Sequence, residues 1–157
     1  MKKAIYPGSF DPITNGHLDI LKRALSVFDE VTVLVAVNPE KHFNFSIEER
    51  VEMIKEAVKD LKGVSVDSYN GLTVEYAKAH GSKHLIRGLR AVSDFEYEFQ
   101  LASANEVVDK SVDMIFFMAH GDKSFISSSA IMELARNHVD VSNLVPPSVL
   151  KKIKEKF

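Results

Sequence analysis

The 157-residue sequence contains no cysteine. This absence excludes disulfide bonds, thiolate catalysis and zinc sites with cysteine ligands, and it agrees with a reducing compartment. The chain also lacks a strong net charge, because its formal value at pH 7 is −2. No global positive field attracts nucleic acid, so any anion site must be built locally from a few cations and backbone amides.

Long hydrophobic runs are missing as well. The longest clearly apolar run covers residues 31–37, which is far too short to span a bilayer. The basic residues at positions 2 and 3 lead quickly into Pro7-Gly8, so no hydrophobic signal-peptide core follows them. We therefore expect a cytoplasmic protein without a membrane partner. Since no repeat, low-complexity tract or linker divides the chain, we expect a single domain over residues 1–157.

Several familiar catalytic signatures are absent from the sequence. It has no Walker P-loop, no GxSxG elbow and no carboxylate cluster for a two-metal nuclease. The histidines at positions 42, 80, 84, 120 and 138 show no metal-ligand spacing. We therefore interpret these histidines as structural or surface residues and predict no protein-held metal site.

Strand-like and helix-like segments alternate along the whole chain. Short β-favouring runs occupy residues 3–6, 31–37, 64–69, 83–86 and 114–118. Helical patterns cover residues 18–28, 46–63, 73–80, 93–108 and 127–137, and a last helix starts at Pro146-Pro147. This alternation predicts an α/β, three-layer Rossmann-like fold with a five-stranded parallel sheet and helices on both faces. Ligands in such sheets bind beyond the carboxyl ends of the strands, where the strand order switches.

The predicted helix over residues 93–108 carries apolar residues on two of its sides. One stripe contains Phe95 and Phe99, and the other contains Tyr97, Leu101 and Val108. Such a helix is either deeply buried or also faces a partner subunit.

Residues 6–17 combine two prolines and two glycines with a final histidine. Thr14 is suited to cap a helix, which places Gly16 and His17 in the first helical turn. Free N–H groups at a helix start attract anions, and His17 adds a directed donor beside them. A rigid turn with a surface histidine explains the same residues, and the residues alone do not decide between the two.

Two further segments have the composition of anion sites. Arg87 and Arg90 flank a Gly-Leu pair just past a predicted strand, and arginine forks suit phosphate oxygens. Residues 127–129 are three serines that lead into a helix, although capping alone explains only one of them. Ordinary solvated surface residues remain an alternative for both arginines, and also for Lys41 and Glu98.

Taken together, these motifs resemble a known pattern. Residues 7–12 followed by Thr14, Gly16 and His17 resemble the (H/T)xGH motif of the nucleotidylyltransferase superfamily, and residues 126–129 resemble its second signature. Residues 86–98 are more specific, because they resemble the phosphopantetheine adenylyltransferase family of bacteria. The resemblance extends from residue 3 to about residue 150 without evident gaps.

This resemblance implies that ATP and 4′-phosphopantetheine react, with Mg²⁺, to give dephospho-CoA and pyrophosphate, and that the chain forms a homohexamer. It gives His17 the catalytic role, through contact with the ATP phosphates. It implies that ATP binds to Ser9, Phe10, His17, Gly88, Leu89, Arg90, Glu98, Lys123, Ser124, Phe125, Ile126, Ser127, Ser128 and Ser129. It also implies that phosphopantetheine binds to Ser9, Lys41, Thr73 and Arg87.

Two positions depart from the family pattern, and two other functions compete. Thr73 stands where the family often has leucine or methionine, and Lys123 stands where an aromatic residue is common.

One alternative function is that of another transferase of the superfamily, acting on nicotinate mononucleotide or glycerol phosphate. The other is a non-catalytic nucleotide sensor that kept the pocket. Assays with a panel of phosphorylated acceptors distinguish the first alternative from the predicted activity. ATP binding without turnover of any acceptor would favour the second alternative.

Overall fold

The computed structural model describes residues 1–90, 92–120 and 126–157, with the side chains of residues 92–95 excluded. Within these ranges, five strands form one parallel sheet in the order β3-β2-β1-β4-β5. The strands are β1 (Lys3–Gly8), β2 (Glu30–Ala36), β3 (Val64–Tyr69), β4 (His84–Leu89) and β5 (Asp113–Met118). The predicted α/β fold with a five-stranded parallel sheet is confirmed.

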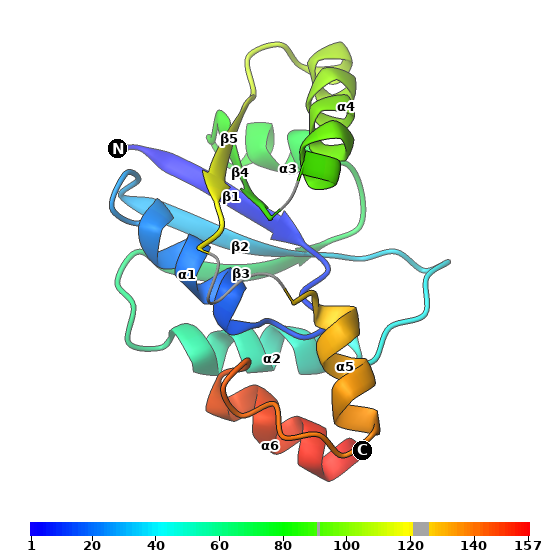
Figure 1. The fold of residues 1–157 in the computed structure, drawn as a ribbon. Helices are drawn as coiled ribbons and strands as arrows, with labels where there is room; N and C mark the ends of the chain where they lie inside the picture. The colour runs from blue at the N-terminus through cyan, green and yellow to red at the C-terminus, as the bar shows by residue number, and fades with distance from the viewer. Residues whose placement is uncertain (91, 121–125) are drawn as a thin grey trace.

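Six helices occur in the described residues, and they cover both faces of the sheet (Figure 1). They are α1 (Asn15–Ala24), α2 (Ile47–Val58), α3 (Thr73–Ala79), α4 (Val92–Val108), α5 (Ser128–Arg136) and α6 (Pro147–Lys156). None of the described helices is both long and apolar enough to cross a membrane.

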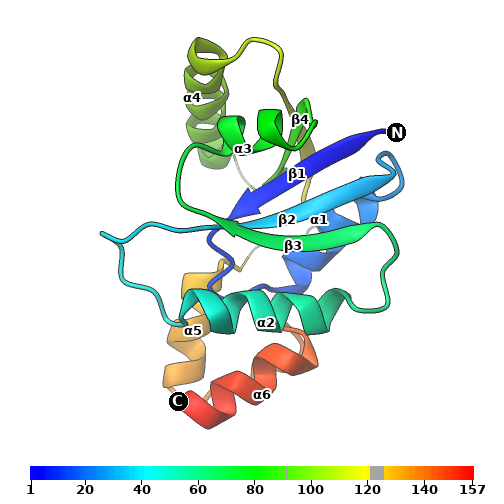
Figure 2. The same ribbon diagram turned by 180° about the vertical axis from the view of Figure 1, so that it is seen from behind.

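The larger core lies between the sheet and helices α1, α2, α5 and α6. Along β1, Ala4 and Tyr6 point to this core, whereas Ile5 joins the smaller core under α3. The alternation follows from the period of two residues in a strand. Seen from behind, α2 runs below β3, and α6 lies beneath α2 (Figure 2). The α6 helix therefore forms an outer layer on the α2 side.

Element boundaries differ from the sequence prediction in several elements, including β4, α2 and α4. Strand β4 continues through Arg87, Gly88 and Leu89, so these residues lie in the strand and not past it. Backbone pairing with β5 extends to Leu89, which the composition of the segment did not indicate. Helix α2 ends at Val58, before the predicted stop at Gly63, and α4 starts at Val92.

The predicted start of α2 is confirmed in atomic detail. The Ser46 side chain accepts a hydrogen bond from the Glu49 N–H, and the Glu49 carboxylate accepts one from the Ser46 N–H. This reciprocal capping box satisfies two backbone donors that the helix leaves unpaired. The predicted capping box of the 93–108 helix falls on side chains outside the described ones.

The strand order switches between β1 and β4. The chain moves outward from β1 to β2 and β3, and then returns to the other side of β1 for β4 and β5. Loops that leave the carboxyl ends of β1 and β4 therefore diverge and leave a crevice between them.

Candidate active site

A cleft of about 530 Å³ opens at the carboxyl ends of β1 and β4. Its walls come from the β1–α1 turn, the first turn of α1, residues 41–44, β4, α4 and residues 126–129. Predicted site residues that line it are Ser9, Phe10, His17, Lys41, Arg87, Gly88, Arg90, Glu98, Ile126, Ser127, Ser128 and Ser129. The fold thus gathers segments far apart in sequence around one cavity.

The first turn of α1 holds His17 in a defined orientation. Thr14 is the N-cap of the helix, and its hydroxyl accepts a hydrogen bond from the His17 N–H at 3.2 Å. In return, the Thr14 N–H donates to Nδ1 of His17 at 3.0 Å. Because a backbone N–H can only donate, Nδ1 must be unprotonated, and the neutral ring carries its proton on Nε2.

The surroundings of His17 keep its ring neutral. Burial lowers the pKa of His17 from its ordinary 6.5 to about 3, and the positive charges of Arg90 and Arg87 add to the effect. The ring also packs edge-on against Phe10, with 5.0 Å between ring centroids. His17 therefore offers a neutral N–H donor to the cleft and carries no charge of its own.

The turn before α1 is held in an unusual backbone conformation. Phe10 has a φ of 46°, a left-handed value that is uncommon for a residue with a side chain. A Cβ on Gly8 would lie 3.1 Å from the Phe10 ring, so the absence of a side chain at Gly8 allows the close approach. The compact turn buries Phe10 and brings its ring against His17.

Arg87 and Glu98 form a closely matched ion pair in the cleft. Glu98 accepts three hydrogen bonds from Nε and Nη2 of Arg87, at 2.7–3.1 Å, and Arg87 Nη1 donates to the Pro7 carbonyl at 2.9 Å. Burial opposes the charge of Arg87, but the hydrogen bonds and charge of Glu98 outweigh it and raise the pKa of Arg87. Glu98 is buried, so the alternative that it is an ordinary exposed surface residue is wrong.

The three serines before and within α5 have different partners. Ser127 is the N-cap and accepts a hydrogen bond from the Ala130 N–H at 3.2 Å. Ser128 donates its hydroxyl to the Pro12 carbonyl at 2.8 Å, which ties the start of α5 to the β1–α1 turn. Ser129 lies 3.1 Å from Ser127, hydroxyl to hydroxyl. The start of α5 thus presents N–H groups and hydroxyls at the cleft, as an anion site requires.

Two predicted site residues among the described ones, Leu89 and Thr73, do not line the cleft. Leu89 lies within β4, where its carbonyl accepts a hydrogen bond from the Ala119 N–H. Thr73 is the first residue of α3, which follows the edge strand β3, two strands away from β1. Lys123, Ser124 and Phe125 lie outside the described residues.

Several residues of the site were not singled out from the sequence. Tyr6, Asp11, Phe43 and Asn44 also line the cleft. Arg50 lies behind it and is only 1% exposed. Arg50 precedes the buried Ile54 by one helical turn, and this spacing was the available signal that it shares the buried face of α2.

Carboxylates in this cleft do not form a metal cage. No group of three potential metal-binding side chains occurs among the described residues. Among the residues that the structure describes, two acidic side chains line the cleft, and both are engaged: Glu98 by Arg87, and Asp11 by the amides of Asn44 and Phe45. The residues present therefore do not suit a divalent cation held by the protein alone.

Comparison with known proteins agrees with this geometry. The family model described as cytidylyltransferase-like matches residues 5–134. A protein named phosphopantetheine adenylyltransferase, from Syntrophus aciditrophicus (strain SB), is 51% identical to the chain over 158 residues, which cover 100% of this chain and 96% of that protein. The chain is therefore a member of the cytidylyltransferase-like family and, within it, belongs with the phosphopantetheine adenylyltransferases.

Proposed function

We propose that this chain transfers the adenylyl group of ATP to 4′-phosphopantetheine and releases pyrophosphate, which makes dephospho-CoA. One observation carries the proposal beyond the family relationship. A neutral N–H donor, His17, shares a cleft with two arginines, a lysine and two helix N-termini. This combination suits the binding of two phosphorylated molecules in contact with each other.

The main obstacle to this reaction is the repulsion between two anions. Two unit charges 4 Å apart repel by about 1 kcal/mol in water and by about 4 kcal/mol at an effective dielectric constant of 20. The nucleophile is already an anionic phosphate oxygen, so the reaction needs no general base. Catalysis then depends on positioning and on electrostatic stabilisation of the transition state.

Each group of the cleft has a defined task in the proposed reaction. An oxygen of the acceptor phosphate forms a bond to the α-phosphorus while the bond to the pyrophosphate oxygen breaks. His17 donates its Nε2 proton in a hydrogen bond to the α-phosphate, where negative charge develops. The start of α5 and Arg90 hold the triphosphate, and Lys41 and Arg87 hold the acceptor phosphate.

Magnesium belongs to this proposal as an ion that arrives with ATP. Mg²⁺ is commonly bound through substrate phosphates with few protein carboxylates, which agrees with the engaged carboxylates of this cleft.

A homohexamer in the cytoplasm is the further part of the proposal. Support for assembly comes from α4, where Tyr97 and Phe99 are 64% and 60% exposed. The helix is therefore not deeply buried within this chain. Contact with a partner subunit is the remaining explanation for its two apolar sides. Light scattering after size exclusion tests this, with Tyr97→Glu expected to dissociate the assembly and Val139→Glu, an exposed position in the loop after α5, expected to leave it intact.

The function is tested by incubation of the protein with ATP, Mg²⁺ and a panel of phosphorylated acceptors. We expect dephospho-CoA and pyrophosphate with 4′-phosphopantetheine, and no product with nicotinate mononucleotide or glycerol phosphate. Turnover of either other acceptor in preference would assign the chain to a different activity of the superfamily. Binding of ATP without turnover of any acceptor would favour a nucleotide sensor.

A further inference from the structure

Asp11 is a carboxylate in a cleft that we propose binds two anions. Its negative charge would repel phosphate, and the proposed reaction gives it no task. Since its charge disfavours anion binding, Asp11 must have some other role at this position.

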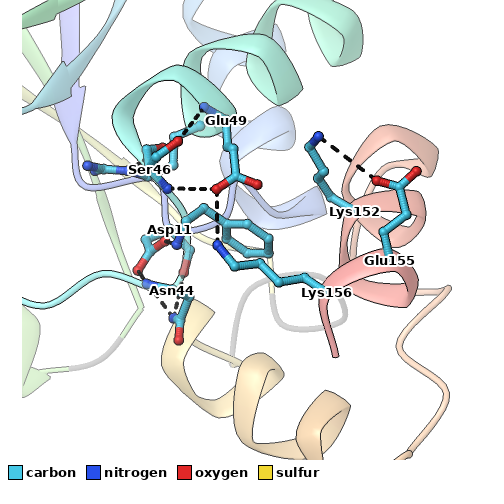
Figure 3. Close-up of polar contacts among 9 residues, drawn as sticks. Asp11, Asn44, Ser46, Glu49, Lys152, Glu155 and Lys156 are labelled. Carbon is cyan, nitrogen blue, oxygen red and sulfur yellow. Dashed lines mark hydrogen bonds and ion pairs between the residues drawn. The ribbon is translucent and has the colours of Figure 1, made fainter.

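The contacts of Asp11 supply that reason. Oδ1 accepts a hydrogen bond from the Phe45 N–H at 2.9 Å. Oδ2 accepts one from the Asn44 N–H at 2.7 Å and one from Asn44 Nδ2 at 3.2 Å (Figure 3). These bonds satisfy both oxygens, and hydrogen bonds to an ionised carboxylate are stronger than bonds between neutral groups.

Asn44 is held from a second side by α5. Arg136, the last residue of α5, donates a hydrogen bond to the Asn44 side-chain carbonyl. Asn44 therefore joins the β1–α1 turn, which leads to His17, to the helix whose first turn carries the cleft serines. We call Asp11, Asn44 and Arg136 the loop clamp.

A buried arginine connects the same two loops at another point. Arg50 donates a hydrogen bond from Nη1 to the Ser9 carbonyl at 2.8 Å, and its guanidinium lies 4.0 Å from the centre of the Phe43 ring. Downstream, Glu49 bridges the Ser46 N–H and Lys156 of α6 (Figure 3). The segment that starts at Lys41 is thus fixed along most of its length, while Lys41 itself is exposed at the cleft.

We propose that Asp11 is a positioning residue, which acts through the loop clamp to hold residues 41–45 so that Lys41 meets the acceptor phosphate. This inference rests on the proposed function. Asp11 itself touches neither reactant. Loss of the clamp frees the loop that carries Lys41 and leaves the triphosphate side of the cleft in place.

The test compares Asp11→Asn, Asn44→Ala and the double variant with the unaltered protein in the full reaction. An asparagine side chain turns an NH₂ group toward a backbone N–H, so Asp11→Asn breaks at least one bond of the clamp. We expect each single variant to raise KM for 4′-phosphopantetheine about tenfold and to change KM for ATP less than about twofold. In the double variant, KM for 4′-phosphopantetheine should be no higher than in the more impaired single variant, because both substitutions disrupt the same set of contacts.

Asp140→Asn is the matched control. Asp140 accepts a hydrogen bond from the Ser142 N–H at 2.9 Å in an exposed loop outside the cleft lining. This substitution removes the same charge and a similar loop contact, so it should leave both KM values unchanged. If Asp11→Asn fails to fold in a thermal melt, Asn44→Ala and Arg136→Met decide the question, since they break the clamp from its other members.

Three kinetic results would overturn the proposal. A loss of kcat in Asp11→Asn with normal Asn44→Ala would mean that Asp11 acts directly on the reactants or on a bound ion. Equal rises in both KM values would indicate a general structural role, and normal kinetics in all variants would remove any role.

Failure of the proposed function would be seen separately, as an unaltered protein that makes no dephospho-CoA. In that case hydrogen exchange of the Asn44 and Phe45 amides still tests the clamp. We expect the two amides to exchange faster in Asp11→Asn, and unchanged exchange would refute the clamp itself.

Discussion

Glu98 of α4 forms a hydrogen-bonded ion pair with Arg87 of β4, in which Nη2 of Arg87 lies 2.7 Å from Oε1 of Glu98. The Glu98 side chain is 6% exposed and the Arg87 side chain 27% exposed, so the pair is largely removed from water. A carboxylate used in this way neutralises and aims an arginine that we propose binds the acceptor phosphate. Because the pair joins α4 to β4, Glu98 should also contribute to the stability of the fold.

The first prediction concerns the stability that this pair provides. Glu98→Ala leaves the Arg87 guanidinium largely buried without its partner. We expect it to lower the free energy of unfolding by about 1–3 kcal/mol, less than for a fully buried pair because Arg87 keeps some solvent contact. Urea unfolding measures the difference, and an unchanged midpoint would show that Glu98 serves a ligand only. Glu96→Ala, an exposed position of α4, is the control.

The second prediction concerns the donor at His17. His17→Ala should lower kcat about 10²–10³-fold, the usual effect of removing one transition-state hydrogen-bond donor, and should change KM for ATP much less. His17→Gln should recover part of the lost rate, because its amide NH₂ can reach the position of Nε2. Equal losses in kcat and in ATP affinity would argue against a transition-state role.

The third prediction follows from the low pKa of His17. The pKa is about 3 in the fold and 6.5 in the unfolded chain, so only the unfolded chain takes up this proton between those values. The stability that depends on neutral His17 is complete above pH 6.5 and is lost as the pH falls toward 3. Compared with the unaltered protein, His17→Gln should therefore gain up to roughly 1 kcal/mol per pH unit below 6.5, short of the full 1.4 because the ring is partly exposed.

Thermal or urea unfolding at pH 7, 5.5 and 4.5 measures this gain. Parallel pH dependences of the two proteins would mean that His17 titrates normally in the fold. For the same reason, protonation of His17 should cause no fall in activity near pH 6.5. The pH profiles of the unaltered protein and of His17→Gln should therefore have the same shape around that pH.

The fourth prediction separates the two arginines of the cleft. Arg87→Ala should mainly raise KM for 4′-phosphopantetheine, and Arg90→Ala should mainly raise KM for ATP. Arg87→Lys should recover little, because a lysine cannot make the forked contact with Glu98 and reach the Pro7 carbonyl as well. Initial-rate kinetics with each substrate varied would reveal the pattern, and an Arg87 effect confined to ATP would reassign that residue.

Much of the fold could be predicted from the sequence because its signals are local. Apolar runs, capping residues and helical spacing indicated each strand and helix, and the Thr14 cap of α1 is confirmed. Boundaries such as the end of β4 were less accurate, since pairing with β5 determines how far the strand runs. The strand order depends on contacts between distant segments, and no local pattern encodes it.

The candidate site could be predicted where a residue type indicates its own chemistry. His17, Arg87 and the serines at the start of α5 are residue types that can bind anions, but only their combination in one motif pattern favoured a site over ordinary surface residues. Partners were harder to predict, because the hydrogen bonds between Asp11 and Asn44 and between Arg50 and Ser9 join residues 33 and 41 positions apart in the sequence. Thr73 was placed through resemblance alone, and the edge position of β3 keeps it out of the cleft lining.

The hydrogen bond from the Thr14 amide also decides which electrons of the His17 ring are available. In the tautomer with the proton on Nε2, the in-plane lone pair belongs to Nδ1, and the helix cap already occupies it. The imidazole is therefore a poor nucleophile toward phosphorus, and no adenylylated histidine should accumulate. A single displacement remains, so ATP made chiral at its α-phosphorus should give dephospho-CoA of inverted configuration.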